Sequence, residues 1–392
     1  MKRIGVYIHI PFCVKKCAYC DFLSAPPCDK GQMESYAEAL CRELKLKAID
    51  TAKTVDTVFF GGGTPSLLPI KAFERIMLTI RECYRISEDA EITVECNPET
   101  VDFDKLECYK RLGVNRISFG LQSASDKELK RIGRIHTFDK FLESYRLARR
   151  VGFDNINIDL ISALPGQSVA DWEYTLETVA KLSPEHISAY SLILEEGTKL
   201  YEDKDKFTFP TEDEDVEMYE ATARILEDYG YKRYEISNYA KEGFESRHNN
   251  RYWKRSEYLG FGIGAASFVG DKRLSNICDI NEYISSLYEG VSCDAEIKQA
   301  IEAKLIAEKE VLSKEDAMAE FFYLGLRRME GVYFRDFWEM FEADAIEVYG
   351  EVMEKLVRQR LLEYTERGGE QIGVRLTTNG IFVSNSVFVE FL

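Results

Sequence analysis

The chain of 392 residues lacks the features that mark secreted and membrane-spanning proteins. No run of about 18 apolar residues occurs, so the sequence predicts no membrane-spanning helix. Its start, MKRIGVYIHIPF, has two basic residues and a short apolar run, but no small-residue cleavage site follows. We therefore expect a cytoplasmic protein whose ten cysteines are reduced rather than paired in disulfides.

A surplus of basic residues is also missing. The chain has 51 Lys and Arg residues against 68 Asp and Glu residues, which gives a formal net charge of −17. This acidic balance argues against nucleic acid or an anionic membrane as the main partner. Internal repeats, low-complexity tracts and Gly/Ser-rich linkers are absent as well, so we expect the parts of the chain to pack together.

What the sequence does contain is the pattern of a large α/β domain. Hydrophobic residues make up 45% of the chain, which suffices for one large domain and a smaller one, or for a single elaborated barrel. Short β-branched or aromatic runs alternate with segments of helical spacing, as in a parallel sheet with crossover helices. Six such units favour an open or closed (β/α) barrel over a doubly wound sheet, although the hydrophobic period alone does not separate the two. The predicted strands span residues 3–10, 56–61, 91–96, 115–120, 155–160 and 186–192, followed by a helix over 213–229 and a seventh strand over 231–237.

The character of the sequence changes after about residue 290. Residues 311–331 and 343–362 predict amphipathic helices, the first ending at Gly331 and the second presenting one apolar face. A strand over 371–376 then leads to Thr378, a candidate cap for a last helix. We therefore expect a barrel domain over residues 1–294, which carries the functional sites, and a small helical, winged-helix-like domain over residues 295–392.

The motif with the most specific chemistry is CVKKCAYC, residues 13–20. Cys13, Cys17 and Cys20 directly follow the first predicted strand, where a barrel of this kind carries its chemistry. One interpretation is a zinc site completed by His9 or Cys28. The other is an iron–sulfur cluster held by three thiolates, which leaves one iron open to an exogenous ligand. The spacing favours the cluster.

Further candidate residues lie at the ends of later strands. Gly61, Gly62 and Gly63 allow close approach of the backbone to a ligand and offer N–H donors, although a turn that needs positive φ is the simpler explanation. Glu95, Gln122 and Asp159 follow other strands and are either helix caps or residues that line the barrel mouth. The segment LGFGIGAASF, residues 259–268, predicts a glycine-lined strand or turn beside a ligand.

The cysteine motif resembles that of the radical S-adenosylmethionine (SAM) superfamily. The wider string YIHIPFCVKKCAYC, residues 7–20, resembles the branch with the HemN-type, oxygen-independent coproporphyrinogen III dehydrogenases and the HemW-type haem chaperones. The resemblance covers nearly the whole chain and implies a partial, TIM-like (β/α)6 barrel with a HemN-type C-terminal domain. It implies a 4Fe–4S cluster on Cys13, Cys17 and Cys20, with SAM chelating the fourth iron. The residues that match SAM-binding positions are Tyr7, Tyr19, Gly62, Gly63, Thr64, Glu95, Gln122, Arg134 and Asp159. In the dehydrogenases, the positions of Gly63, Thr64, Gln122, Arg134 and Asp159 also touch a second SAM.

Two departures separate this chain from the dehydrogenases. They carry an additional cysteine where this chain has Phe22, and an N-terminal extension where only twelve residues precede Cys13. The string HNNRYW, residues 248–253, matches the HNxxYW motif of the chaperones, in a polar segment that we expect to be a loop. His248 is the candidate haem ligand, and Tyr252 and Trp253 are candidates to stack on the macrocycle. The alternative is a hydrogen-bonded histidine with Tyr252 and Trp253 as core residues.

The resemblance therefore implies a haem chaperone that binds haem and transfers it to acceptor haemoproteins. The cluster and SAM would regulate or complete this transfer, and the main role would be non-catalytic. The alternative is a coproporphyrinogen III dehydrogenase, in which a 5′-deoxyadenosyl radical oxidises propionates to vinyl groups; another radical enzyme, such as a methyltransferase, is a third possibility. The implied partners are haem and its acceptors, with a transient membrane association through the acceptor and a homodimer left open.

Overall fold

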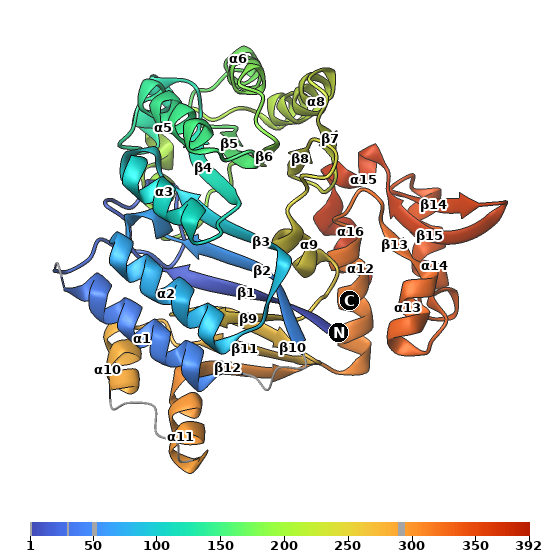
Figure 1. Cartoon of the computed structure of the whole chain (residues 1–392). Helices are drawn as coiled ribbons and strands as arrows, with labels where there is room; N and C mark the ends of the chain where they lie inside the picture. Colours follow the sequence, from blue (N-terminus) through green and yellow to red (C-terminus); the bar gives the residue numbers. More distant parts are fainter. Residues whose placement is uncertain (1, 30, 49–52, 289–294) are drawn as a thin grey trace.

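The computed structural model describes residues 2–29, 31–48, 53–288 and 295–392 (Figure 1). Six neighbouring strands run parallel in chain order, and each overlaps a strand predicted from the sequence. Their inner residues are buried on both faces, as expected for a sheet covered by helices. These strands are β1 (Lys2–Ile10), β2 (Lys53–Gly62), β3 (Ile86–Cys96), β4 (Arg116–Gln122), β5 (Ile156–Ser162) and β6 (His186–Ser191).

Crossover helices cover the outer face of the parallel strands (Figure 1). In the second of them, Phe73, Ile76, Met77 and Ile80 form one buried stripe at helical spacing. The helices are α1 (Gln32–Leu46), α2 (Ile70–Cys83), α3 (Phe103–Arg111), α4 (Asp126–Arg131), α5 (Phe138–Val151), α6 (Val169–Lys181) and α8 (Glu212–Asp228). The connecting loops also contain α7 (Lys199–Glu202) and the short turns η1 (Pro65–Leu67), η2 (Pro98–Thr100) and η3 (Lys204–Lys206).

Shorter strands extend the sheet at both edges, so that it has 12 strands among the described residues. Beside β1 lie β9 (Tyr258–Phe261), β10 (Ala266–Val269), β11 (Lys272–Asn276) and β12 (Ile306–Val311); beside β6 lie β8 (Asn238–Ala240) and β7 (Lys232–Arg233). The seventh strand, predicted over 231–237, is shorter in the structure, where β7 covers only Lys232–Arg233. The carboxylate of Glu235 accepts a hydrogen bond from the Ser237 N–H at 3.0 Å, and the chain turns there into an antiparallel hairpin.

Three more helices complete this part: α9 (Arg247–Trp253), α10 (Ile280–Tyr288) and α11 (Ala295–Leu305). The glycine-rich segment 259–268 forms β9, β10 and the turn between them, in which Gly262 and Gly264 have φ values of +94° and +62°. Within the described ranges, no helix combines the length and apolar character needed to cross a membrane.

The C-terminal part has its own hydrophobic core, in which Phe322, Phe337, Met353 and Val387 are fully buried. It consists of α12 (Lys314–Gly325), β13 (Val332–Tyr333), α13 (Phe334–Phe341), α14 (Ala345–Arg358), β14 (Leu362–Arg367), β15 (Glu370–Leu376), α15 (Thr378–Phe382) and α16 (Ser384–Val389). The predicted helix end at Gly331 is wrong. Gly331, with φ +73°, lies in the turn before β13, where a side chain would collide with the backbone of β15.

The chain passes from the large hydrophobic core to the smaller one at the end of β12. This strand pairs with β11 of the large sheet, whereas the next residue, Leu312, packs against the smaller core. Glu320 of α12 is 1% exposed and joins the parts, because it accepts hydrogen bonds from Arg255 Nε at 2.8 Å and Arg273 Nη2 at 2.5 Å. The C-terminal part is therefore fixed against the sheet by buried ion pairs.

Candidate functional site

The cysteine loop leaves the carboxyl end of β1 and folds back on itself. Cys13 N–H donates to the Ala25 carbonyl at 3.1 Å, and Ala25 N–H donates to the Pro11 carbonyl at 2.9 Å. At the tip of the loop, Ala18 N–H donates to the carbonyl of Ile132 at 2.9 Å, just after α4. The loop is therefore held at its base and at its tip, which fixes the cysteines at the end of the barrel where the parallel strands terminate.

The three cysteine thiols are free and lie among hydrogen-bond donors. Cys13 Sγ lies 3.5 Å from Thr64 Oγ1, and Arg134 Nη1 donates to Cys17 Sγ at 3.5 Å. Such donors stabilise thiolates, the form of cysteine that binds iron. Burial raises the pKa of the Cys20 thiol, and Cys17 and Cys13 raise it further because their charges are close. Three neighbouring thiolates need a cationic partner, and an iron cluster supplies one.

The two residues considered as fourth ligands do not join the thiols. His9 has partners at both ring nitrogens: Nδ1 lies 3.2 Å from the Tyr7 hydroxyl, and Nε2 lies 2.9 Å from the Leu23 carbonyl. Cys28 is exposed and its thiol faces Asp29 at 3.7 Å. In the part of the chain that the structure describes, no three His, Cys, Asp or Glu side chains converge on a single metal position. The thiolates of a cluster bind different irons and need not converge, so the loop fits a cluster better than zinc.

The glycine turn after β2 makes room for the cysteine loop. A Cβ on Gly63 would lie 3.1 Å from Cys13 Sγ. Gly62 has φ +110°, and a Cβ there would lie 2.6 Å from the His9 ring. The backbone donors of the turn already have partners, because Gly62 N–H donates to Glu95 Oε2 at 3.2 Å and Gly63 N–H to a carbonyl at the end of β1. The glycines therefore act mainly through the space that they leave.

A cavity of about 200 Å³ lies inside the barrel next to this turn and is lined by Tyr7, Glu95 and Asp159. Burial, and then the charge of Asp159, raises the pKa of Glu95 to about 8. Asp159 accepts hydrogen bonds from Ser118 Oγ at 2.9 Å and Asn157 Nδ2 at 2.8 Å. A carboxyl group beside the glycine turn is suited to bind a cationic amino group such as that of SAM.

Arg134 connects the cysteine loop to the strand ends. Besides its bond to Cys17, it donates from Nη2 to Asn97 Oδ1 at 2.5 Å. Tyr19 lies near it: burial raises the pKa of Tyr19, and the charge of Arg134 opposes that rise. Gln122, at the end of β4, is buried and has φ +79°, which is rare for a residue other than glycine and is often found at functional sites. These three residues thus lie where the sequence places them, at the cluster end of the barrel.

The segment HNNRYW is a helix, α9, and the prediction of a loop is wrong. Ser246 Oγ accepts a hydrogen bond from Asn249 N–H at 3.3 Å. The buried carboxylate of Glu91, on β3, accepts from the N–H groups of Arg247 and His248 at 3.1 and 3.0 Å. These acceptors satisfy donors that a helix start leaves unpaired, so a short polar segment becomes helical here.

His248 lines the same cavity as Glu95 and is 1% exposed. Its Nδ1 lies 2.9 Å from Thr57 Oγ1, its Nε2 lies 2.9 Å from the Tyr252 hydroxyl, and its ring stacks on Phe59. Burial, followed by the charge of Arg251, lowers the pKa of His248 to about 3. The imidazole is therefore neutral, as metal ligation requires, but Nε2 becomes available only when the Tyr252 hydroxyl moves away.

Trp253 does not lie beside His248. Arg327 packs over its ring, with Cζ 4.5 Å from the ring centroid. Trp253 lines a different cavity of about 380 Å³, between α9 and the C-terminal part. Successive residues of a helix point about 100° apart, which explains why Tyr252 and Trp253 face different cavities. Of the two aromatic side chains expected to stack on the macrocycle, Tyr252 lines the cavity of His248 and Trp253 does not.

Sequence reasoning missed several residues that line the barrel cavity, above all Arg116, Ser118 and Asn157. They belong to the strands themselves rather than to the loops that follow. The sequence could have indicated Arg116 and Asn157, because each is a charged or amide side chain inside an otherwise apolar strand. Burying such a group is unfavourable unless it binds a polar partner.

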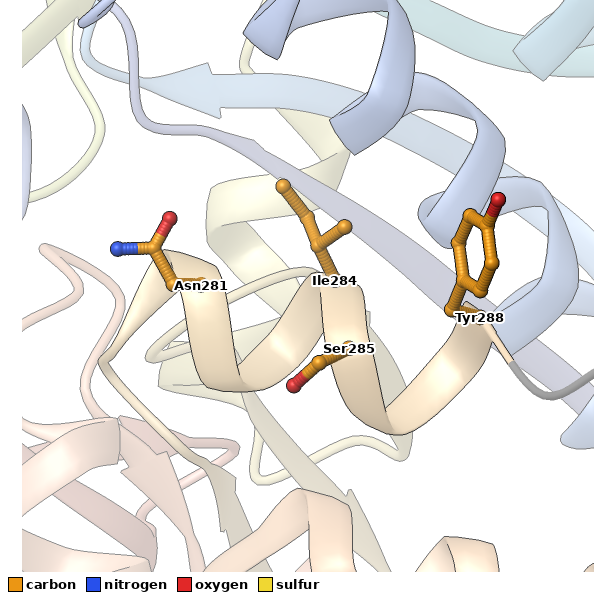
Figure 2. A pocket seen from close by; sticks show the side chains of 4 residues that line it. All are labelled: Asn281, Ile284, Ser285 and Tyr288. Atoms are coloured by element: carbon orange, nitrogen blue, oxygen red, sulfur yellow. The ribbon is translucent and has the colours of Figure 1, made fainter.

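A separate cavity of about 370 Å³ lies on α10, which packs beside α1 (Figure 2). It is lined by Asn281, Ile284, Ser285 and Tyr288. The tyrosine is 75% exposed, and its ring centroid lies 5.5 Å from the guanidinium carbon of Arg42. None of the site residues predicted from the sequence lines this cavity.

Comparison with known proteins agrees with this geometry. Residues 7–179 match the Radical SAM superfamily, and residues 312–383 match the HemN C-terminal domain. The structure of coproporphyrinogen III oxidase (HemN) from Escherichia coli has the same fold, with a TM-score of 0.84 at 21% identity over 100% of this chain and 90% of that chain. The fold and the cysteine loop thus define a radical SAM protein with a HemN-type C-terminal domain. Such a protein carries a 4Fe–4S cluster and SAM, and the cysteine loop, glycine turn and Glu95 fit both.

Relatives with similar sequences show to which family of radical SAM proteins the chain belongs. "Heme chaperone HemW" of Bacillus subtilis is 35% identical over 99% of both chains. Its namesake in Lactococcus lactis is 36% identical over 100% of this chain and 98% of the relative. A mitochondrial radical S-adenosyl methionine domain-containing protein of Danio rerio is 30% identical over 99% of this chain and 86% of its own length. The chain belongs to the HemW heme chaperone family.

Proposed function

We propose that this protein is a haem chaperone, which binds haem and hands it to acceptor haemoproteins. Relatives named as heme chaperones, at 35 and 36% identity over essentially the whole chain, support this function. So does Phe22, which stands 63% exposed on the cysteine loop where a dehydrogenase carries its additional cysteine. The observation that carries the proposal is His248, a neutral imidazole on the wall of the barrel cavity.

The proposed iron ligand is Nε2 of His248. At about 200 Å³, the cavity is smaller than the roughly 300–1,000 Å³ of sites that enclose a drug-sized ligand, so the macrocycle cannot enter it whole. We infer that haem binding displaces the Tyr252 hydroxyl from Nε2. Tyr252 follows His248 by one helical turn, so a small movement of its side chain is sufficient.

The residues around the cluster have separate proposed roles. Cys13, Cys17 and Cys20 hold the cluster, and Arg134 supports the thiolate of Cys17. Glu95, aligned by Gly62 N–H, binds the amino group of SAM. The remaining matched residues complete the SAM site: Tyr7, Tyr19, Gly63, Thr64, Gln122 and Asp159. When bound, the cluster and SAM supply one-electron chemistry, which we propose regulates or completes haem transfer.

The wider setting is also a proposal. The nine described cysteines are free, in keeping with a reducing compartment such as the cytoplasm. We propose haem and acceptor haemoproteins as partners, with any membrane contact made through the acceptor. Size-exclusion measurements would show whether the protein forms a homodimer. We propose that the chain has two domains, a barrel domain and a C-terminal helical domain. Their boundary lies after β12 rather than at residue 294, because β12 pairs within the large sheet.

The function is tested by titrating haem into cluster-loaded protein with SAM present. His248→Ala should weaken haem binding at least tenfold and shift the Soret band, while iron content and SAM affinity stay unchanged. Tyr252→Phe is the matched control, because it removes only the hydroxyl that occupies Nε2; haem affinity should hold or increase. An unchanged Soret band in His248→Ala would assign the ligand to another residue, and efficient decarboxylation of coproporphyrinogen III would favour the dehydrogenase.

A further inference from the structure

The barrel cavity contains a buried positive charge without a partner. Arg116, the first residue of β4, lines the cavity and is 2% exposed. Among the residues that the structure describes, none forms a hydrogen bond or ion pair with its guanidinium, and its Nε is buried without an acceptor. A buried charge without a partner is strongly unfavourable, so the position implies a compensating group.

Other buried arginines of this chain show what is missing. Arg251 pairs with Asp56, and Arg255 pairs with Glu320 at 2.8 Å. Arg134 donates to Asn97 and to the thiol of Cys17. These three guanidinium groups have partners within the chain, whereas Arg116 faces the cavity.

No acidic residue that lines the cavity forms an ion pair with Arg116 in the described structure. Asp159 accepts hydrogen bonds from Ser118 and Asn157. Burial and Asp159 raise the pKa of Glu95 to about 8, although the charge of Arg116 lowers it, so Glu95 is mostly protonated at neutral pH. His248 is neutral because burial lowers its pKa to about 3. Arg116 is therefore the one fixed positive charge among the described residues that line the cavity.

We propose that Arg116 binds a carboxylate of the ligand that enters this cavity. A guanidinium offers a planar pair of donors that matches a carboxylate with two parallel hydrogen bonds. A cavity of about 200 Å³ has room for a short carboxylate-bearing arm, and Ser188 and Asn249 on its wall offer further polar contacts. The identity of the carboxylate rests on the proposed function. It is a haem propionate, which would enter the cavity while His248 binds the haem iron. The amino-acid end of a SAM molecule has the same chemistry and is the other source.

The test compares wild type, Arg116→Gln and Arg116→Lys, each loaded with its cluster. Three probes are titrated: haem, haem dimethyl ester, in which the propionates carry no charge, and SAM. Arg116→Gln should weaken haem binding tenfold or more, whereas Arg116→Lys should retain part of the affinity. The dimethyl ester should bind wild type and Arg116→Gln equally, and SAM affinity should not change. Arg146→Gln, on the exposed face of α5, controls for the loss of one positive charge.

Thermal unfolding separates this role from a structural one. Without ligand, Arg116→Gln should unfold at a higher temperature than wild type, because an unpaired buried charge is gone. With haem, the order should reverse. A clear loss of stability in the ligand-free variant would mean that Arg116 supports the fold, and would overturn the proposal.

The remaining outcomes are equally decisive. Weaker SAM binding with unchanged haem binding would keep the carboxylate role and assign the carboxylate to SAM. Unchanged affinity for both would overturn the proposal while wild-type haem binding still supported the chaperone. If wild type binds no haem, the proposed function fails, and the SAM titration alone then decides whether Arg116 binds a carboxylate.

Discussion

Among the three glycines of the turn after β2, Gly63 is the one whose Cβ would meet a backbone atom first. A Cβ there would lie 2.8 Å from the Phe12 carbonyl oxygen and 3.1 Å from Cys13 Sγ, so Gly63→Ala must push the cysteine loop away. We expect less than half the wild-type iron content after anaerobic reconstitution. Gly152→Ala is the control: it has φ +95° with no atom within 4 Å, so it should cost about 1 kcal/mol of strain and leave iron content unchanged. Full iron loading of Gly63→Ala would contradict the proposed fit.

Glu95 gives the site a predicted pH dependence. Its pKa of about 8 means that the free protein holds a neutral carboxyl below that pH, while the amino group of SAM binds best to a carboxylate. SAM affinity of the cluster-loaded protein should therefore fall up to tenfold for each pH unit below about 8, and level off above it. Glu95→Gln should weaken binding by about 1–3 kcal/mol at pH 8.5 and show little of this dependence. Calorimetric measurement of SAM affinity across pH 6.5–9 checks both expectations. If the affinities of wild type and Glu95→Gln change with pH in the same way, Glu95 does not bind the amino group.

The residues found from the sequence and those missed differ in where they lie on their strands. Glu95 and Gln122 lie at the carboxyl ends of β3 and β4, where barrels are known to carry chemistry, whereas Asp159, also predicted at a strand end, lies in the middle of β5. Arg116 opens β4 at the opposite end, and its role depends on what it lacks, namely a partner. A missing contact cannot be seen in a sequence, because it depends on every element packed around the side chain.

At the level of elements, the parallel strands were predictable and α9 was not. Each strand has its own buried apolar run, which is a local signal. Helix α9 is stabilised by Glu91, whose carboxylate lies 156 residues before Arg247 in the chain. No local pattern in HNNRYW contains that acceptor, so a polar segment with poor helix formers looked like a loop.

The role of Glu91 leads to a prediction for this helix. Glu91→Ala leaves the N–H groups of Arg247 and His248 without acceptors, and should lower the free energy of unfolding by about 1–3 kcal/mol. Haem affinity should fall as well, because α9 carries the proposed ligand, while iron content stays the same. Chemical denaturation and haem titration measure the two effects. Glu88→Ala, an exposed position on the same strand, should change neither; a Glu91→Ala variant that keeps full haem affinity would show that α9 does not depend on this carboxylate.

For the whole molecule, the absence of linkers predicted that the two parts pack together, and they do. The predicted boundary at residue 294 reflected a change in composition and lies outside the described residues, whereas the boundary that we propose follows β12, where the side chains begin to pack against the smaller core. Strand β12 has five exposed residues and little apolar signal, so its pairing with β11 could not be read from its sequence. The C-terminal part also covers Trp253 of α9, which connects it to the helix of the proposed haem ligand.

The contact between the parts depends on Glu320, and this gives a prediction for the whole fold. Glu320→Ala leaves Arg255 and Arg273 without their shared carboxylate; Arg255 then keeps its exposed partner Asp271, at 3.0 Å. Removing one partner of a buried ion pair typically costs about 3–5 kcal/mol, so the midpoint of denaturant unfolding should fall sharply. The exposed pair of Arg375 and Glu363 is the matched control, and Glu363→Ala should cost less than about 1 kcal/mol.

The shape of the transition says how the parts cooperate. If Glu320 couples them, the unfolding of Glu320→Ala should split into two steps, because each part has its own core. Intrinsic fluorescence follows both, since Trp172 is buried in the large core and Trp338 lies on α13 of the smaller part. Replacing each tryptophan with Phe in turn assigns the steps. A single transition at the wild-type midpoint would mean that the main-chain bonds between the parts, such as Ile236 N–H to the Arg327 carbonyl at 3.1 Å, hold them together without Glu320.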